Sequence, residues 1–198
     1  MRKTGFRHLF AVALLFLSLS GCGYNTLQEQ AEWVKATWAQ VLNQYQRRAD
    51  LVPALVGVVK AYAAHEKSVF EEIAQARAHL ENTRVSTAAL NDATALEQYS
   101  QAQKRMSTAL ERLLLVAENY PQLKADGVFR DLQIQLEGTE NRIAFARTRY
   151  IDAVAAFNIS VRSFPSNLTA KYLSYEILPT FSVDNEGAIS KAPTVSIK

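Results

Sequence analysis

The sequence has few residues that interrupt a helix. Between residues 24 and 164 it contains only two prolines, Pro53 and Pro121, and three glycines, Gly57, Gly127 and Gly138. Runs of alternating apolar and polar residues bounded by turn residues are also missing there, so we expect no β-sheet in this region. Few helix breakers and no strand pattern together predict long helices and an all-α fold.

The sequence also lacks the motifs that usually carry catalysis. It has no G-x-S-x-G nucleophile elbow, no Walker loop and no G-x-G-x-x-G dinucleotide motif. His65-Glu66 begins an H-E-x-x-H zinc motif, but Val69 stands where the second histidine would be. His79 lies fourteen residues beyond His65, too far along one helix to share a metal ion. We therefore expect His65 to be an ordinary helix residue and predict no enzyme, no catalytic residue, no metal and no cofactor.

Cysteine occurs once, at Cys22, so no disulfide can form within the chain. It follows a basic head, Arg2, Lys3 and Arg7, and an apolar run from Leu9 to Leu19. This order is typical of a secretory signal. A helix of the run is about 16 Å long, against about 30 Å for the hydrocarbon core of a bilayer, which favours cleavage over a membrane span.

The four residues Leu19-Ser20-Gly21-Cys22 resemble the bacterial lipobox, in which the Cys thiol receives a diacylglyceryl group and becomes the new N-terminus. We therefore predict a lipoprotein signal peptide at residues 1–21 and lipidation of Cys22. The alternative is a buried free thiol. Acylation is favoured because an exported domain has little use for a lone thiol.

Gly23, the residue after the predicted lipidation site, bears on the location of the protein. An Asp at this position often retains lipoproteins in the inner membrane, and it is missing here. We expect an exported, membrane-anchored lipoprotein, in the outer membrane and facing the periplasm in a two-membrane bacterium, and otherwise at the cell surface.

The excess of positive charge lies in the leader. The whole chain has 22 basic and 19 acidic residues, and without the leader it has 19 of each. Proteins that bind nucleic acids need a clustered basic face. We therefore expect no nucleic-acid partner.

Apolar residues recur at intervals of three and four in three long stretches, which begin at Leu27, Leu96 and Phe129. This spacing places them on one face of each helix, and the short connections favour antiparallel neighbours. Residues 22–164 are therefore predicted to form an elongated antiparallel up-and-down bundle of three to four long helices, with a polar loop at 81–88. The predicted core residues are Leu27, Ala31, Val34, Trp38, Val41, Tyr45, Leu55, Val59, Tyr62, Val69, Ile73, Ala76, Leu80, Leu96, Tyr99, Met106, Leu110, Leu113, Ala117, Tyr120, Phe129, Leu132, Leu136, Ile143, Ala146, Tyr150, Ala153, Phe157 and Phe164.

The segment around Pro53 supports two interpretations. Asp50 can cap a new helix with Pro53 in its first turn, which makes a corner at 49–53. Alternatively, the apolar stripe keeps its phase across the proline, which predicts one kinked helix from 25 to 80. We favour the corner, because an unbroken helix of that length would leave residues such as Trp38 uncovered beyond its shorter neighbours.

Residues 165–198 hold three of the five prolines. A short helix is expected at 167–175, followed by a tail that is either extended along the bundle or partly disordered. Phe181 and Val183 could pair with the edge of another strand, but a loosely packed terminus is favoured.

Several charged residues fall within or close to the apolar stripes. Arg48 and Glu66 interrupt two of them, and the third stretch carries Glu137, Glu140, Arg142, Arg147 and Arg149. Such groups can form a binding surface or a buried paired network that sets helix register. We favour ordinary surface ion pairs, each contributing about 0–1 kcal/mol.

Several segments together resemble the LemA family. They are Gly21–Asn25, Arg47–Pro53, Val59–Tyr62 with His65-Glu66, Tyr120–Ala125 and Leu136–Ile143. The resemblance implies a membrane-anchored helical-bundle protein without an established enzymatic activity. It also implies association with other envelope proteins, and one branch of the family is linked with magnetosome membranes.

The leading functional hypothesis is a non-enzymatic, lipid-anchored scaffold or adaptor of the cell envelope, whose long helical faces bind other envelope proteins. A second hypothesis is a self-assembling, membrane-remodelling or membrane-organising protein that forms homo-oligomers through its remaining apolar faces. An enzyme that uses the Arg/Glu-rich third stretch is the third.

Overall fold

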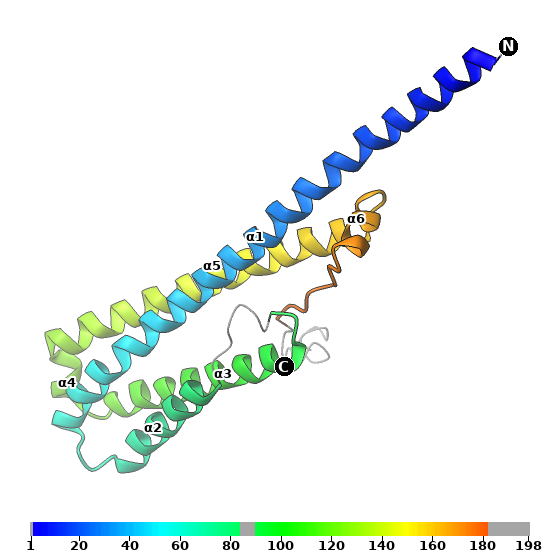
Figure 1. Cartoon of the computed structure of the whole chain (residues 1–198). Coiled ribbons are helices and arrows are strands. Elements are labelled where there is room, and N and C mark those ends of the chain that lie inside the picture. Colours follow the sequence, from blue (N-terminus) through cyan, green and yellow to red (C-terminus); the bar gives the residue numbers. More distant parts are fainter. Residues whose placement is uncertain (1, 84–89, 182–198) are drawn as a thin grey trace, which may run out of the picture.

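A computed structural model describes residues 2–83 and 90–181 of the chain, with side chains from Gly23 onward. The helices in these ranges are α1 (Arg2–Tyr62), α2 (Lys67–Asn82), α3 (Ala93–Ala117), α4 (Pro121–Ala125), α5 (Gly127–Arg162) and α6 (Ser166–Tyr172) (Figure 1). The same ranges contain no β-strand. The predicted all-α fold is therefore confirmed.

The four long helices form an antiparallel bundle. Along the chain, α1, α2, α3 and α5 alternate in direction, as the colours of Figure 1 show. α1 packs along α5 and α2 packs along α3, whereas α1 and α3 approach each other closely at few places. Short α6 lies against both α1 and α5. The up-and-down bundle predicted from the apolar stripes is thus confirmed.

The corner predicted at 49–53 is wrong. α1 passes through Pro53 without ending, and the chain turns later, at residues 63–66. A proline inside a helix costs about 3 kcal/mol, because it removes one hydrogen bond and its ring clashes with the preceding turn. Pro53 is exposed, while Val52 and Leu55 beside it are almost completely buried. Burial of these neighbours offsets the local cost of the proline.

The unbroken helix from 25 to 80 is also wrong in its end point, since Ala63–Glu66 separate α1 from α2. The expectation that a long first helix would leave Trp38 uncovered is not met. The 36 residues of α5 run antiparallel along α1, and Trp38 is fully buried. Because the chain turns at 63–66, the part of α1 that contains Trp38 lies alongside α5.

Polar side chains cap the helices that follow. Asp92 Oδ1 accepts hydrogen bonds from the backbone N–H of Thr94 and Ala95 at 2.9 and 3.1 Å, and so starts α3. α3 ends at Ala117, and Pro121 begins the short helix α4. The predicted polar loop begins where α2 ends, and residues 84–89 lie outside the described ranges.

Most residues of the predicted stripes are buried, as expected. Two are not. Tyr62 is exposed and donates a hydrogen bond from its hydroxyl to Asp126 Oδ2 at 2.8 Å. Phe164 lies beyond the end of α5 and is largely exposed. The spacing of apolar residues therefore predicted a buried face that extends too far at the ends of α1 and α5.

The segment after α5 packs against the bundle as far as Phe181, whereas the sequence favoured a loosely packed terminus. α6 occupies most of the predicted short helix, and the following residues pack back on α5. Asn158 Nδ2 donates to the Leu178 carbonyl oxygen and Asn158 Oδ1 accepts from the Leu178 N–H, both at 2.9 Å. Phe181 is buried. A loosely packed terminus is therefore wrong up to residue 181, and Val183 lies outside the described residues.

Candidate functional site: a buried arginine layer and an adjoining groove

The buried residues fall into two clusters that follow each other along the bundle. We call one the aromatic core, after its large rings; it includes Trp38, Tyr99, Tyr150, Phe157 and Phe181. We call the other the aliphatic core; it includes Val52, Leu55, Val59, Leu110 and Leu113. On α1 the two clusters are separated by the turn that carries Arg48.

Arg48 is the centre of a polar layer between these cores. Only 2% of its surface is exposed. Its Nη1 donates to Ser107 Oγ at 2.8 Å and to Glu140 Oε1 at 2.9 Å. Its Nη2 donates to the Gln103 backbone carbonyl at 3.1 Å and to the side-chain oxygen of the same residue. One guanidinium therefore joins α1 to both α3 and α5.

The hydrogen bonds of this layer compensate the cost of burying the positive charge of Arg48. A guanidinium offers five donors in a fixed plane, and here two of its nitrogens meet oxygens from two helices. Glu140 balances its charge and reaches partly into solvent. The Tyr45 ring lies 5.3 Å from the Arg48 carbon Cζ, within cation–π range. These directed contacts set the register of three helices.

The surface ion pairs favoured for the charged residues are therefore wrong for Arg48, which belongs to the buried network considered as the alternative. Within the described residues, two arginines of α5 lie over aromatic rings instead of pairing with a carboxylate at the surface. Arg147 lies over the Phe181 ring at 4.6 Å and Arg149 over the Phe145 ring at 6.0 Å. Glu66 accepts a hydrogen bond from the Tyr120 hydroxyl at 3.3 Å.

The aromatic core is built from rings that meet edge to face or at a tilt. Trp38 lies 5.2 Å from Tyr150, 6.0 Å from Tyr99 and 5.8 Å from Phe181, measured between ring centroids. Such geometries are favoured over face-to-face stacking. Burial raises the pKa of Tyr99 and of Tyr150 to about 12, because it disfavours the charged phenolate. Both hydroxyls therefore remain protonated at neutral pH.

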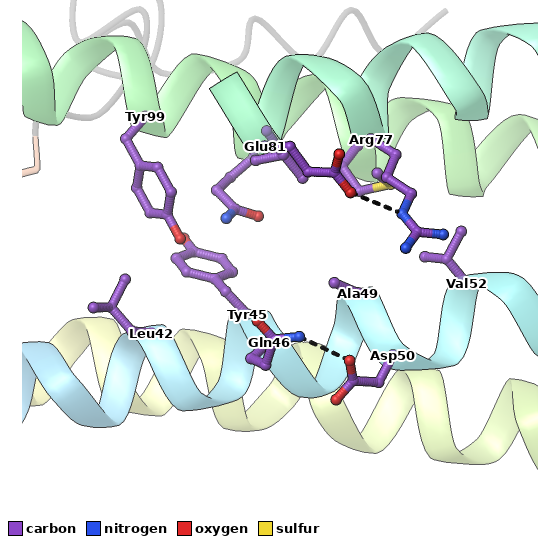
Figure 2. Close-up of a pocket in the computed structure, with 12 residues that line it drawn as sticks. Leu42, Tyr45, Gln46, Ala49, Asp50, Val52, Arg77, Glu81 and Tyr99 are labelled. Atoms are coloured by element: carbon purple, nitrogen blue, oxygen red, sulfur yellow. Dashed lines mark hydrogen bonds and ion pairs between the residues drawn. The ribbon is translucent and has the colours of Figure 1, made fainter. Parts of the chain in front are cut away.

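A groove of about 360 Å³ opens beside the polar layer, between α1 and the α2–α3 pair (Figure 2). Tyr45 and Tyr99 point toward each other at one end of it, with ring centroids 5.7 Å apart. Its charged rim is held by contacts within single helices: Gln46 Nε2 donates to Asp50 at 2.8 Å, and Arg77 Nε pairs with Glu81 at 3.3 Å. The remaining lining residues are Leu42, Ala49, Val52, Leu80, Gln103 and Met106.

The groove lining mixes aliphatic side chains with Tyr45, Tyr99 and Gln103, and its rim carries both signs of charge. This composition suits a peptide segment or helix better than a metal ion or a phosphate. Among the described residues, no group of three His, Cys, Asp or Glu is placed to hold a metal ion. His65 lies in the turn between α1 and α2, so the expectation of a helical position is wrong for it.

The predicted lipidation site lies within α1. The backbone of Cys22 is helical, while its side chain is outside the described part of the structure. The next residue, Gly23, lies against α6: a β-carbon added to it would be 3.4 Å from Ser166 Cα and 3.6 Å from Thr169 Oγ1. Within the part of the chain that the structure describes, no helix is both long enough and apolar enough to span a bilayer.

The sequence pointed to Arg48 and Glu140 but not to the partners of Arg48 on α3. An arginine within an apolar stripe was the signal for a buried network. Gln103 and Ser107 on α3 carried no comparable signal, because single polar residues at intermediate positions are common on helices. Their role depends on the alignment of α3 with α1, which the pattern of one helix does not contain.

The chain is similar to known proteins over most of its length. The family model described as "LemA family" matches residues 37–197. Two curated relatives, Magnetosome protein MamQ 2 and Magnetosome protein MamQ 1 of Paramagnetospirillum magneticum, are each 26% identical over 166 residues. Each alignment covers 74% of this chain and 60% of the relative, so the chain spans less than two thirds of the relatives' length.

Proposed function

The chain belongs to the LemA family, and on that basis we propose that it is a lipid-anchored helical scaffold of the cell envelope. In this proposal the bundle binds other envelope proteins and carries out no chemistry itself. Family membership and the two relatives support the coarser description, a membrane-associated helical protein. The anchor, the adaptor role and the location are proposed from the residues of this chain.

The observation that carries the proposal is where the packed bundle begins. Gly23, directly after Cys22, contacts α6, and Leu27 one turn later is completely buried. The preceding part of α1 extends past the end of the bundle (Figure 1). Cleavage before Cys22 would therefore remove the projecting helix and leave the acylated residue at the edge of the packed body. Two or three acyl chains at that position give durable membrane attachment.

Metabolic labelling with a clickable palmitate analogue tests the anchor. The wild-type chain is expected to incorporate the label, and Cys22→Ala to lose it together with membrane retention. Asn25→Ala, three residues away and exposed, is the matched control and is expected to label normally. Equal labelling of Cys22→Ala would refute lipidation at this site.

The groove between α1 and the α2–α3 pair is the surface proposed to bind a partner protein. Its rim residues Gln46 and Glu81 are exposed, and its lining offers both apolar and polar side chains. A photo-crosslinking amino acid at Gln46 is expected to trap a discrete envelope protein in living cells. The same probe at Asn141, exposed on α5 and absent from the groove lining, is the control. Adducts with lipid alone, or identical adducts at both positions, would argue against the adaptor role.

Gly23 supports an outer-membrane location facing the periplasm, if the host has two membranes. Density-gradient separation of the membranes is expected to place the wild-type protein in the outer-membrane fraction. Accumulation in the inner-membrane fraction would contradict this part of the proposal and leave the anchor itself unaffected.

A second candidate function, self-assembly that organises a membrane, is favoured by the outer face of α5. Ile134, Phe145 and Ile159 are exposed there, and their spacing places them within about 40° of one another around the helix. The relatives' name, magnetosome protein, points in the same direction. Concentration-dependent oligomers that disappear in Phe145→Asp would support this function. A monomer at all concentrations would exclude it.

A further inference from the structure

Three large apolar side chains are exposed at the α6 end of the bundle. Phe164 is 80% exposed, Leu168 62% and Tyr172 87%. Lys171 is exposed among them, and no acidic residue occurs from Ser163 to Tyr175. We call Phe164, Leu168, Lys171 and Tyr172 the α6 surface. Scattered apolar residues are normal on proteins, but three within nine residues call for an explanation.

The α6 surface is held in a defined orientation. Ala170, on the opposite side of α6, is buried in the aromatic core. Ser166 Oγ donates to the carbonyl oxygens of Ser160 at 2.6 Å and Ser163 at 2.8 Å, at the start of the helix. At its end, the Tyr175 N–H donates to the Ala170 carbonyl at 2.9 Å. Leu168, Lys171 and Tyr172 are therefore displayed by a packed helix, and Phe164 by the short turn that precedes it.

The α6 surface also lies beside the proposed anchor. A β-carbon on Gly23 would be 3.4 Å from Ser166 Cα, so Cys22 is one residue away from a contact with α6. Figure 1 shows α6 at the end of the α1–α5 pair from which the first part of α1 projects. Acyl chains attached to Cys22 would hold this end of the bundle at the bilayer.

The chemistry of the α6 surface fits the boundary between headgroups and acyl chains. Tyrosine is enriched at that depth, apolar side chains enter the outer acyl region, and a lysine extends its stem along apolar surface while its ammonium reaches the phosphates. A symmetric contact with a second copy would bring two Lys171 ammonium groups toward each other, which is unfavourable. The bilayer is therefore the better occupant.

We propose that the α6 surface inserts into the bilayer interface and acts as a second attachment that sets the tilt of the bundle on the membrane. This inference rests on the proposed lipid anchor at Cys22. It predicts that the α6 end is in contact with lipid while the opposite end of α5 is not. Ile134 provides the matched comparison, because it is 66% exposed and about 40 Å from the end of α5.

The test uses the full chain, exported and processed in a bacterium, purified in detergent and placed in phosphatidylethanolamine–phosphatidylglycerol vesicles. Leu168→Cys, Tyr172→Cys and Ile134→Cys are each labelled with an environment-sensitive NBD dye. Lipids with a nitroxide on the acyl chain near the headgroup then quench any dye that reaches that depth. Acylation blocks the Cys22 thiol, so each introduced cysteine is the one labelled residue and the wild-type chain takes up no dye.

Blue-shifted emission and loss of most of the signal at residues 168 and 172, with no loss at residue 134, support the proposal. Equal quenching at all three positions overturns the proposal. So does an absence of quenching at all three, in chains that take up dye at the introduced cysteine and float with the vesicles. Neither result affects the anchor. Dye uptake by the wild-type chain shows a free Cys22 and refutes the anchor instead. A spectral shift that depends on protein density rather than on lipid indicates a second copy as the occupant and also overturns it.

Discussion

The two cores of the bundle are assembled in different ways. The aliphatic core lies where α1 is joined to α2 by the turn at residues 63–66, and α3 to α5 by residues 118–126, which include α4. The aromatic core contains Trp38 of α1, Tyr99 of α3, Tyr150 of α5 and Phe181 beyond α6, which are distant in sequence. One end of the bundle is thus closed by local connections and the other by long-range ring contacts. Arg48 joins the two ends through its contacts with α3 and α5.

Removing one buried side chain from each core tests how much each core contributes to stability. Trp38→Ala and Leu55→Ala are expected to lower the free energy of unfolding by about 3–5 and about 2–5 kcal/mol, the ranges typical of buried large-to-small substitutions. Both residues are completely buried. Urea unfolding measured by circular dichroism gives these losses.

Hydrogen exchange on the same two variants shows how far each loss spreads. If the polar layer couples the cores, both variants lose protection throughout the bundle. Loss confined to the mutated half in each variant would show that the two cores unfold separately.

Arg48→Met tests the polar layer itself. The substitution keeps much of the side-chain volume but removes the guanidinium donors of the Gln103 side-chain oxygen and carbonyl, and leaves Glu140 without its counter-charge. We expect a loss of about 3 kcal/mol, near the lower end for breaking a buried pair, because Glu140 reaches solvent. Arg112→Met, on an exposed salt bridge with Glu72, is the control and should change stability by less than about 1 kcal/mol. Equal effects of the two variants would contradict a structural role for the layer.

High pH is expected to weaken the aromatic core specifically. The folded-state pKa values of Tyr99 and Tyr150, about 12, exceed the usual tyrosine value of about 10. The unfolded chain therefore loses these protons first as the pH rises. The contribution of the two protonated tyrosines to the free energy of unfolding is fully present below pH 10 and is lost as the pH rises toward 12. The expected loss is about 1 kcal/mol for each tyrosine near pH 11. Urea midpoints measured across this range, compared with those of Tyr99→Phe and Tyr150→Phe, isolate the tyrosine contribution from that of lysines.

The smallest expected effect concerns the hydroxyl of Tyr150. This oxygen is buried and has no hydrogen-bond partner among the described residues. Removing an unsatisfied buried polar group while keeping the ring relieves a desolvation cost, so Tyr150→Phe is expected to be neutral or to stabilise the fold by up to about 1 kcal/mol at neutral pH. Differential scanning calorimetry measures the shift. A clear destabilisation would indicate that a bound water or another group satisfies the hydroxyl.

The sequence was sufficient for the fold class, the antiparallel order and most of the buried faces, since all three follow from the spacing of apolar residues and from loop length. It was not sufficient at Pro53. The local cost of a proline is visible in sequence, but the burial of Val52 and the contacts of Arg48 that offset it come from other helices. The burial of Phe181 was missed for a related reason, because this residue belongs to no periodic stretch and its contacts are with Trp38, Tyr150 and Arg147, which are distant in sequence.

The unbroken passage of α1 through Pro53 has a mechanical consequence. From Gly23 to Tyr62 this single helix measures about 60 Å, at about 1.5 Å per residue. A chain that bent at residue 49 would reach less than about three quarters of that height above its attachment point. Under the lipid anchor proposed at Cys22, the turn at 63–66 and helix α4 would lie at the end of the bundle that is remote from the membrane. In that arrangement the length of α1 would determine how far from the membrane a partner could be contacted.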